Sequence, residues 1–387
     1  MKVMKFGGSV LHHEAGFQAM VDIVKRQNEK HVIVISAFSD ITRKLNSMMN
    51  STLHQSYDVS MNELNSIIQY HEMLSDVLLP NKSTFKDLLE KTSILLQRLV
   101  KGISLTKEIS PRISDMILAQ GEILATYFVK ELLSSHEVNV GLIDSGNIII
   151  TNDIHGSAKP IETLVSHHVH TTLLPAFDDH DYIIMAGFIG KNAHGDITTM
   201  GYESSNLTAA LLGSTLKADE ITIWTDVCGI RSSDPKHIFN TIAIPRLSYM
   251  QAQELANNGL KLLHHWMLDL PLKHSIPVSI ANAFDDEGER TRISNEYDEV
   301  VPTIIIRHSQ DLKKYTQLFS DDDSILRISI FTQNDDIIQK IYALASELSM
   351  NDTIIVKTFE SRNMHYVIIR DHLANYFMNA LHTLIEK

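Results

Sequence analysis

The chain has 387 residues, 44% of them hydrophobic and 21% charged, and carries a formal net charge of −13. This size and balance predict a globular protein of more than one domain, and the acidic charge argues against a general nucleic-acid binder, which needs a basic face. The single cysteine, Cys228, excludes an internal disulfide, and no apolar run reaches the roughly 20 residues of a membrane helix, so we expect a cytoplasmic protein with no membrane partner.

Strand and helix patterns alternate from the first residues onward. The sequence predicts a strand at Val3–Phe6, an amphipathic helix at Ala15–Gln27 and a buried strand at His31–Ser36. We expect no secretion signal before the first strand. Residues 43–135 then place Leu and Ile at helical spacing, with turn signals at prolines. Further strands are expected at Val138–Ile143, Asp181–Ala186, Glu220–Trp224 and Val278–Ala281, with a helix at Asn206–Leu216. Alternation with apolar strands predicts an α/β fold, a mainly parallel sheet sandwiched by helices.

The composition changes at the charged segment Asp285–Arg290. Strand, helix, strand, strand and helix patterns follow at Ile325–Phe331, Asp336–Leu348, Thr353–Thr358, His365–Ile369 and Leu373–Ile385. This order predicts a ferredoxin-like βαββα unit. We therefore expect a large domain over 1–284, a linker over 285–299 and a small regulatory or dimerisation domain over 300–387.

A lysine and two glycines end the first strand, in the run Lys5-Phe6-Gly7-Gly8. Glycines let backbone N–H groups approach a phosphate closely, and the lysine adds a positive charge beside them. Two further small-residue loops, Gly187–Gly190 and Thr198–Ser205, follow later strands. Together these loops predict a nucleotide-phosphate site. The histidines are scattered without a metal-ligand spacing such as HExxH, so we assign no protein metal ligand.

In this order, the segments resemble those of the aspartokinases, within the amino acid kinase family. The matching runs are Lys5–Val10, Ser36–Thr42, Gln120–Glu122, Thr151–Gly156, Trp224–Lys236 and Gly259–His264. They span residues 1–295 in unbroken order, and the run from Trp224 is the most specific. The C-terminal unit resembles an ACT domain, of which aspartokinases usually carry two and this chain has room for one.

The resemblance implies an amino acid kinase fold and transfer of the γ-phosphoryl of ATP to the side-chain carboxylate of L-aspartate, giving 4-phospho-L-aspartate. ATP and Mg²⁺ are the implied cofactors, a small amino acid the implied partner, and a homodimer the implied assembly. Because the acceptor oxygen is already an anion, no enzyme nucleophile is required. Catalysis then consists of aligning two anions and neutralising the charge on the transferring group.

The resemblance also assigns residues on the nucleotide side of the site. Lys5 and Lys261 are the expected catalytic cations. The expected nucleotide-binding residues are Lys5, Phe6, Gly7, Gly8, Thr225, Asp226, Arg231, Lys236, Lys261 and Leu262. Lys236 stands where the family has arginine, which keeps the charge and loses the bidentate fork.

On the acceptor side the chain departs from the family pattern. The expected acceptor-binding residues are Ser36, Thr42, Glu122, Ser157, Ser205 and Asn206. Ser157 replaces the family's clamp arginine, Tyr202 a second arginine, Ser204 a glycine and Asn206 an acidic residue, while Asp40 replaces a glycine. Lys159 lies near enough in sequence to restore one charge. Because these changes gather on one side of the site, neutral drift is the weaker explanation.

Three hypotheses follow. The first is an aspartokinase with a modified acceptor site, and the second is a kinase of the same fold that phosphorylates a different small carboxylate. The third is a nucleotide-binding regulatory paralogue with weak catalysis. Retention of both phosphate-side lysines favours the first two, and the similarity along the chain favours aspartate as the acceptor.

Overall fold

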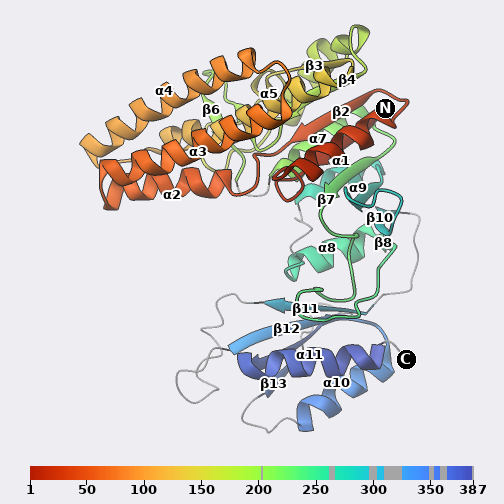
Figure 1. The fold of residues 1–387 in the computed structure, drawn as a ribbon. Helices are drawn as coiled ribbons and strands as arrows, with labels where there is room; N and C mark the ends of the chain where they lie inside the picture. The colour runs from red at the N-terminus through yellow and green to blue at the C-terminus, as the bar shows by residue number, and fades with distance from the viewer. Residues whose placement is uncertain are drawn as a thin grey trace. The chain divides into compact units, whose positions relative to one another are not determined.

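The computed structural model describes residues 1–201, 204–260, 266–295, 303–308, 325–347, 353–357 and 364–385. The chain forms two compact units, which are described separately (Figure 1). The first comprises Met1–Val227 and Asp269–Glu287, and the second comprises Cys228–Leu268 and Gly288–Lys387.

A parallel sheet forms the centre of the first unit. Its strands run in the order β3-β4-β2-β1-β7-β9, each parallel to its neighbour. Their bounds are β1 Lys2–Phe6, β2 His31–Ile35, β3 Val140–Leu142, β4 Tyr182–Ala186, β7 Ile221–Thr225 and β9 Val278–Asn282. β2 and β4 are buried along their whole length, which explains their continuous apolar sequences.

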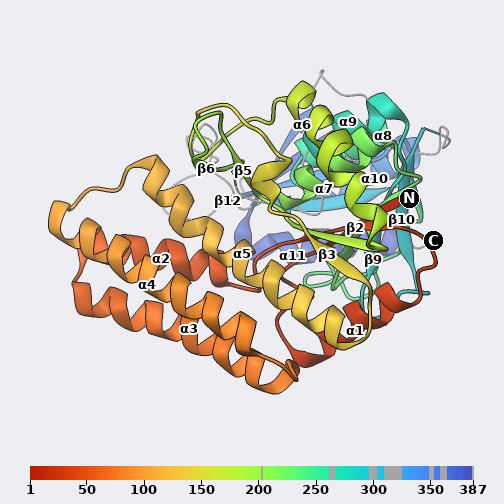
Figure 2. The same ribbon diagram turned by 90° about the horizontal axis from the view of Figure 1, so that it is seen from above.

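Helices cover this sheet, and several of them also pack on one another (Figure 2). They are α1 Glu14–Lys25, α2 Ile41–His54, α3 Tyr57–Leu78, α4 Ser83–Thr106, α5 Pro111–Ser135, α6 Glu162–His168 and α7 Ser205–Leu216. Short helical turns occur at η1 Ser145–Asn147, η2 Val169–Leu173 and η3 Pro175–Asp178, and a hairpin pairs β5 Ile189–Lys191 with β6 Ile197–Thr199. Helix α9, Trp266–His274, precedes β9 in the chain.

Helix α5 packs against strands β3 and β4 and against helices α2 and α4 of the first unit. Ser110 caps its first turn by accepting a hydrogen bond from the Ile113 N–H, and Pro111 occupies the first helical position, where its missing N–H costs nothing. Phe128 of α5 contacts Phe17, Phe38 and Phe85, with ring centroids 5.2–5.3 Å apart. This aromatic cluster fixes the helix in the core, so side chains along its length are held in defined places.

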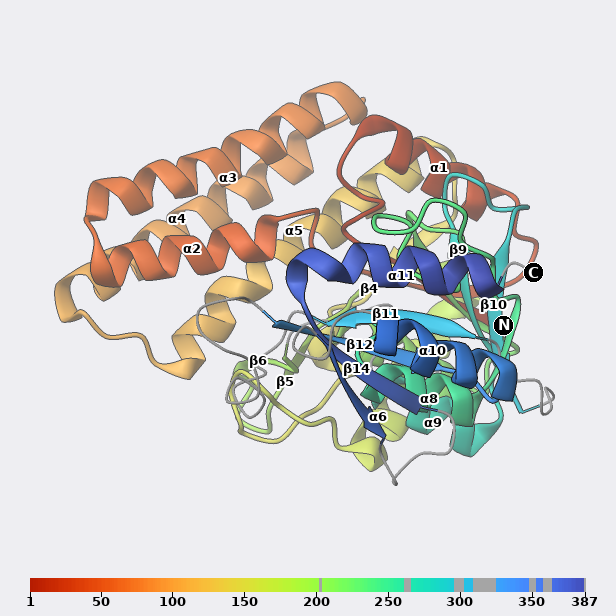
Figure 3. The ribbon, with the colours of Figure 1, turned by 90° about the horizontal axis from the view of Figure 1, so that it is seen from below.

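The second unit carries the C-terminal sheet, with strands in the order β11-β12-β14-β13, all antiparallel. The bounds are β11 Ile304–His308, β12 Ile325–Phe331, β13 Thr353–Lys357 and β14 Met364–Arg370. Helices α10 Asp335–Glu347 and α11 Asp371–Ile385 lie side by side against one face (Figure 3) and share its apolar core. The same unit contains α8, Tyr249–Asn257, and the parallel strands β8 Arg246–Ser248 and β10 Arg290–Ser294.

The predicted α/β class and the C-terminal βαββα order are confirmed. Four strand features were not predicted: the β5–β6 hairpin inside a segment interpreted as a glycine loop, β8, β10 inside the expected linker, and β11 at the edge of the C-terminal sheet. The domain bounds 1–284, 285–299 and 300–387 stay a prediction, although the compact units group 228–268 with the C-terminal residues. Within the described ranges, no helix is long and apolar enough to cross a membrane.

Candidate active site

The loop after β1 brings a cation over closely packed backbone. A Cβ atom added to Gly7 would lie 3.1 Å from the Lys5 Nζ, so this ammonium sits over the glycine. A Cβ at Gly8 would lie 2.9 Å from the Ala37 carbonyl oxygen, which any real side chain would have to displace. The two glycines are therefore needed where β1 meets the loop after β2. Phe6 itself is fully buried against Trp224, which leaves only its backbone near the site.

Glu122 lies beside this loop, on α5. Its carboxyl is 3% exposed, and burial raises its pKa from 4.5 to about 8, although the Ala37 N–H and the Lys5 charge act in the opposite direction. One of its oxygens, Oε2, is buried and makes no hydrogen bond among the described residues. A buried carboxyl with an unsatisfied oxygen is suited to receive a cationic or hydrogen-bond-donating ligand group.

The segment that links β2 to α2 packs between the loop after β1 and helix α5. A Cβ added to Gly121 would lie 3.0 Å from the Ala37 side chain, which shows how closely α5 approaches this segment. Asp40 adopts φ +66°, a left-handed conformation that explains why the family places glycine here and why a short polar residue is tolerated. Its carboxylate forms an ion pair with Arg43 at 2.7 Å. Ser36 and Thr42 are both partly buried at the ends of this segment.

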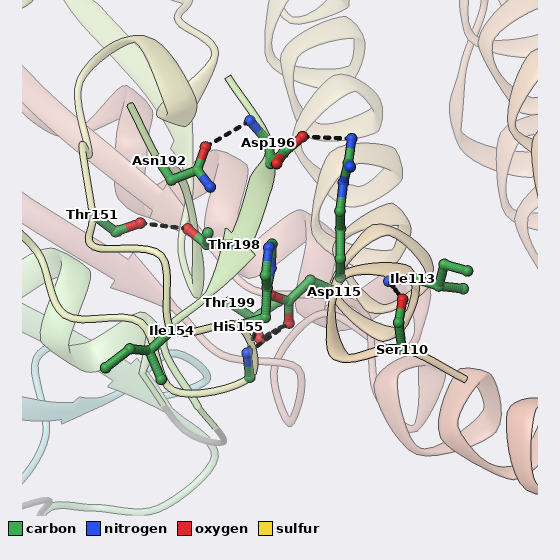
Figure 4. A network of polar contacts seen from close by, with 12 residues as sticks. Ser110, Ile113, Asp115, Thr151, Ile154, His155, Asn192, Asp196, Thr198 and Thr199 are labelled. Carbon is green, nitrogen blue, oxygen red and sulfur yellow. Dashed lines mark hydrogen bonds and ion pairs between the residues drawn. The ribbon is translucent and has the colours of Figure 1, made fainter. Parts of the chain in front are cut away.

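A second group of polar residues surrounds Asp115, two turns earlier on α5 (Figure 4). Asp115 is 1% exposed. Its carboxylate accepts hydrogen bonds from the Thr199 hydroxyl at 2.5 Å, the His155 Nδ1 at 2.7 Å and the Gly156 N–H at 3.1 Å. One side chain thus joins α5, the loop around Gly156 and strand β6. The sequence analysis did not identify Asp115, because a single aspartate on a helix gives no signal.

The start of α7 lies next to the β4–β5 turn. A Cβ added to Gly187 would lie 2.7 Å from the Ser205 Oγ, so this turn can carry no side chain there. Ser204 precedes the helix without capping it. The buried Ser204 Oγ and Asn206 Oδ1 make no hydrogen bond among the described residues. The helix N-terminus and the Ser204 hydroxyl suit an anionic ligand, whereas the Asn206 amide oxygen needs a hydrogen-bond donor.

The remaining predicted residues fall into three groups. Thr225 ends β7 and Asp226 follows it in the first unit, where Thr225 donates to the Asp226 carboxylate at 3.1 Å. Arg231 belongs to the second unit, where its guanidinium binds Thr241 and forms a 2.7 Å ion pair with Glu289. Lys236 is exposed in that unit, after a turn held by Asp234. Lys261 and Leu262 lie outside the described residues, as does Tyr202.

Within the first unit, Lys5, Gly7, Gly8 and Glu122 meet around Ala37. Ser157 is exposed in the loop held by Asp115. Gly201 lies near the same loop, since a Cβ added to it would lie 3.8 Å from the Gly156 carbonyl oxygen. The described residues contain no group of three or more His, Cys, Asp or Glu side chains that could hold a metal ion.

Comparisons with known proteins identify the family. The family model described as "Amino acid kinase family" matches residues 1–282. The lysine-sensitive aspartokinase 3 of Escherichia coli is 28% identical over 317 residues, which are 80% of this chain and 68% of that protein. An aspartokinase of Chlamydia pneumoniae is 31% identical over 287 residues, covering 74% of this chain and 61% of its own length.

Two further comparisons set the limits of this similarity. A bifunctional aspartokinase/homoserine dehydrogenase of Buchnera aphidicola is 28% identical over 73% of this chain, and the chain spans only 35% of its length. The crystal structure of E. coli aspartokinase III with aspartate and ADP superposes with a TM-score of 0.84, at 20% identity and over 100% of both chains. At that identity the structural match establishes the fold.

Proposed function

The chain belongs to the amino acid kinase family, and from this premise we propose that it transfers the γ-phosphoryl group of ATP to the side-chain carboxylate of L-aspartate, giving 4-phospho-L-aspartate. The observation that carries the proposal is the placement of the Lys5 ammonium over Gly7, next to the buried carboxyl of Glu122. One cation for phosphate and one carboxyl for an amino group are what this reaction needs side by side. The named relatives are aspartokinases, which supports aspartate as the acceptor.

The loop after β1 is the proposed phosphate side. Gly7 and Gly8 present backbone without side chains, and Lys5 supplies the charge that offsets the negative charge on the transferring phosphoryl. Thr225 and Asp226 lie at the carboxyl end of a parallel strand, where such sheets bind ligands, and we assign them to the nucleoside. Arg231, Lys236, Lys261 and Leu262 stay proposed nucleotide contacts. Mg²⁺ is expected to enter with the nucleotide, held mainly by phosphates and water.

Glu122 is the proposed partner of the acceptor's ammonium group. In the ligand-free chain its carboxyl holds a proton below a pH of about 8, because the charged form is poorly solvated. An ammonium group at this place would favour the carboxylate, so that binding releases the proton. Ser36, Thr42, Ser157, Ser205 and Asn206 are the other proposed acceptor contacts, and they orient the side-chain carboxylate toward the phosphate side.

A second acceptor is favoured by one observation. Ser157 and Asn206 replace charged family residues, and the Asn206 Oδ1 is buried without a hydrogen-bond partner in the described part of the chain. A buried amide oxygen needs a hydrogen-bond donor, so a pocket changed in this way fits another small carboxylate that carries such a donor, with the same phosphate chemistry. A regulatory paralogue with weak catalysis is the third possibility, and it requires Lys5 to be dispensable.

An acceptor screen tests these proposals. Purified full-length chain is incubated with Mg-ATP and, separately, aspartate, glutamate, N-acylated amino acids and other small carboxylates, with hydroxylamine to trap any acyl phosphate. Aspartate-dependent hydroxamate formation is the expected result. Hydroxamate with a different carboxylate alone establishes the second hypothesis, and ATP binding without any hydroxamate establishes the third.

Ser157→Arg sharpens the screen, because it restores the family's charge on the exposed loop. If aspartate is the acceptor, its KM should fall or stay nearly the same. If the pocket serves another acceptor, the arginine should impair turnover of that acceptor.

We further propose a homodimer in a reducing, cytoplasmic compartment, in keeping with the single cysteine.

A further inference from the structure

We propose that Asp115 is the positioning residue of the acceptor side, holding the loop that contains Ser157 and strand β6 in the arrangement that receives the acceptor. This inference rests on the proposed function, in which these segments bind the acceptor. Asp115 itself need not contact any substrate. It acts through Gly156 and Thr199, which precede the proposed acceptor contacts Ser157 and Ser205 in the chain.

Every group around the Asp115 carboxylate is a donor. The Thr199 hydroxyl reaches Oδ1, His155 Nδ1 reaches Oδ2, and the Gly156 N–H lies 3.1 Å from both oxygens. An ionised carboxylate accepts only, with lone pairs for all of these bonds. Because Asp115 is 1% exposed, the carboxylate is shielded from water and these donors satisfy its charge.

The tip of the loop, residues 153–157, depends on this carboxylate. Its other hydrogen bonds within the described chain stay inside the loop, from the Ile154 N–H to Asn152 Oδ1, from the His155 N–H to the Asp153 carbonyl and from the Ser157 N–H to the Ile154 carbonyl. The bonds that leave the tip end on Asp115 (Figure 4). Removal of the carboxylate therefore leaves the tip intact as a turn but without its attachment to α5.

Helix α5 places this attachment at a fixed distance from the phosphate side. Asp115 and Glu122 are seven residues apart, which is two turns on the same helix face and about 10.5 Å along the axis. Glu122 lies beside Lys5, whereas Asp115 holds the loop. The helix thus sets the spacing between the proposed ammonium partner and the loop that carries Ser157.

The same helix offers a matched control. Arg112 forms a 2.6 Å ion pair with Asp196, in the turn of the β5–β6 hairpin. The Arg112 side chain is 59% exposed, so the pair contributes little to stability. It joins α5 to the hairpin that also holds Thr199, but it makes no bond to the loop around Gly156.

The test compares Asp115→Ala, Thr199→Val and Arg112→Ala in the full-length chain, with KM and kcat measured for ATP and for the acceptor found in the screen. We expect Asp115→Ala to raise the acceptor KM about tenfold to a hundredfold, since misplacement of a binding segment by about 1 Å has effects of this size. The KM for ATP should stay within about twofold. Thr199→Val, which keeps the other Asp115 bonds, should give a smaller rise, and Arg112→Ala none.

Asp115→Asn adds a rescue arm. The amide keeps one acceptor oxygen for Thr199, and its NH₂ group can donate to His155 Nδ1 in the other tautomer. The Gly156 N–H keeps its contact with the amide oxygen, and only its contact with the other position, now NH₂, becomes a donor–donor pair. The acceptor KM should therefore lie between those of the wild type and Asp115→Ala. An unchanged acceptor KM in Asp115→Ala overturns the proposal, as does an equal rise in both KM values.

Amide hydrogen exchange separates this proposal from the proposed function. If the wild type phosphorylates no carboxylate, the proposed function fails, but exchange at residues 153–157 can still be measured. Asp115→Ala should speed this exchange by at least about tenfold, with α5 unchanged, and Arg112→Ala should not. Equal exchange in the two variants overturns the positioning role. If Asp115→Ala does not fold, the acceptor KM and the hydrogen exchange of Thr199→Val decide whether Asp115 has the positioning role.

Discussion

Glu122 couples proton binding to folding. The folded pKa is about 8 and the ordinary value is 4.5, so between these values the folded chain holds a proton that the unfolded chain has released. Stability from this group is fully present below pH 4.5 and is lost as the pH rises through 8. We predict that Glu122→Gln flattens the fall in unfolding free energy over this window, by on the order of a few kcal/mol.

Urea unfolding of the ligand-free chain between pH 5 and 8.5 measures this effect. Glu131→Gln is the control, since Glu131 lies on the same helix in an ion pair with Lys130. A Glu122→Gln variant that keeps the wild-type slope would show that the carboxyl is already charged in the folded chain. The proposed ammonium site would then have to bind without proton release.

Lys5 is the residue on which proposed catalysis depends most. We predict that Lys5→Ala lowers kcat roughly a hundredfold or more, because it removes a preorganised charge from the transferring phosphoryl. The fold should persist, since the Lys5 side chain is only partly buried. Lys2→Ala, on the same strand, is the control, as Lys2 pairs with Glu29 at 3.9 Å. Wild-type turnover in Lys5→Ala would remove Lys5 from its role.

At the scale of elements, sequence patterns predicted the strands whose side chains are buried in a regular pattern along the strand. β2 and β4 are buried on both faces and are therefore continuously apolar. β5 was missed because glycine at 187 and 190 is typical of a loop. In the structure, Gly187 is required because Ser205 approaches its backbone closely. β10 was missed because its alternating arginines resemble a charged linker.

The candidate site was predictable only where it follows family motifs. Lys5, Gly7, Gly8 and Glu122 lie in such runs, and the structure brings them together. Asp115 bonds to partners 40 to 84 residues away, and such a network leaves no local pattern. Its discovery needed the three-dimensional contacts.

Helix α11 makes a contact that bears on the proposed nucleotide side. His382 is 2% exposed, and its Nε2 lies 2.8 Å from the Ser232 Oγ, which also accepts from the Ile242 N–H. Ile238 belongs to the apolar core of the C-terminal sheet. The segment between these residues carries Lys236, so the C-terminal unit holds part of the proposed nucleotide site in place.

We predict that His382→Ala raises the KM for ATP several-fold and leaves the acceptor KM unchanged, because a buried hydrogen bond to this segment is lost. Titration with a non-hydrolysable ATP analogue should show the same loss of affinity. His372→Ala on the same helix is the matched control, since His372 is exposed. Lower thermal stability with unchanged nucleotide affinity would make the contact purely structural.

For the whole molecule, the ACT-like C-terminal unit bears on assembly. In the described part of its sheet, β13 is an edge strand, with a neighbour only in β14. Edge strands present unpaired backbone groups, which a second copy can satisfy. The described residues contain one such unit, and a second copy of the chain would supply the second unit of an effector site built from two.

We predict that the full-length chain is a homodimer assembled through its C-terminal unit, with any amino-acid effector bound at that joint. Light scattering of the full chain should give twice the mass of 43.7 kDa, and a chain ending at Ser294 should give a monomer. Since truncation removes the core that covers Ile238, the shortened chain should carry Ile238→Ser to prevent association through this newly bared side chain. A dimer that survives in this shortened variant would place the interface before residue 294, and the C-terminal unit would then act on the nucleotide segment within one chain.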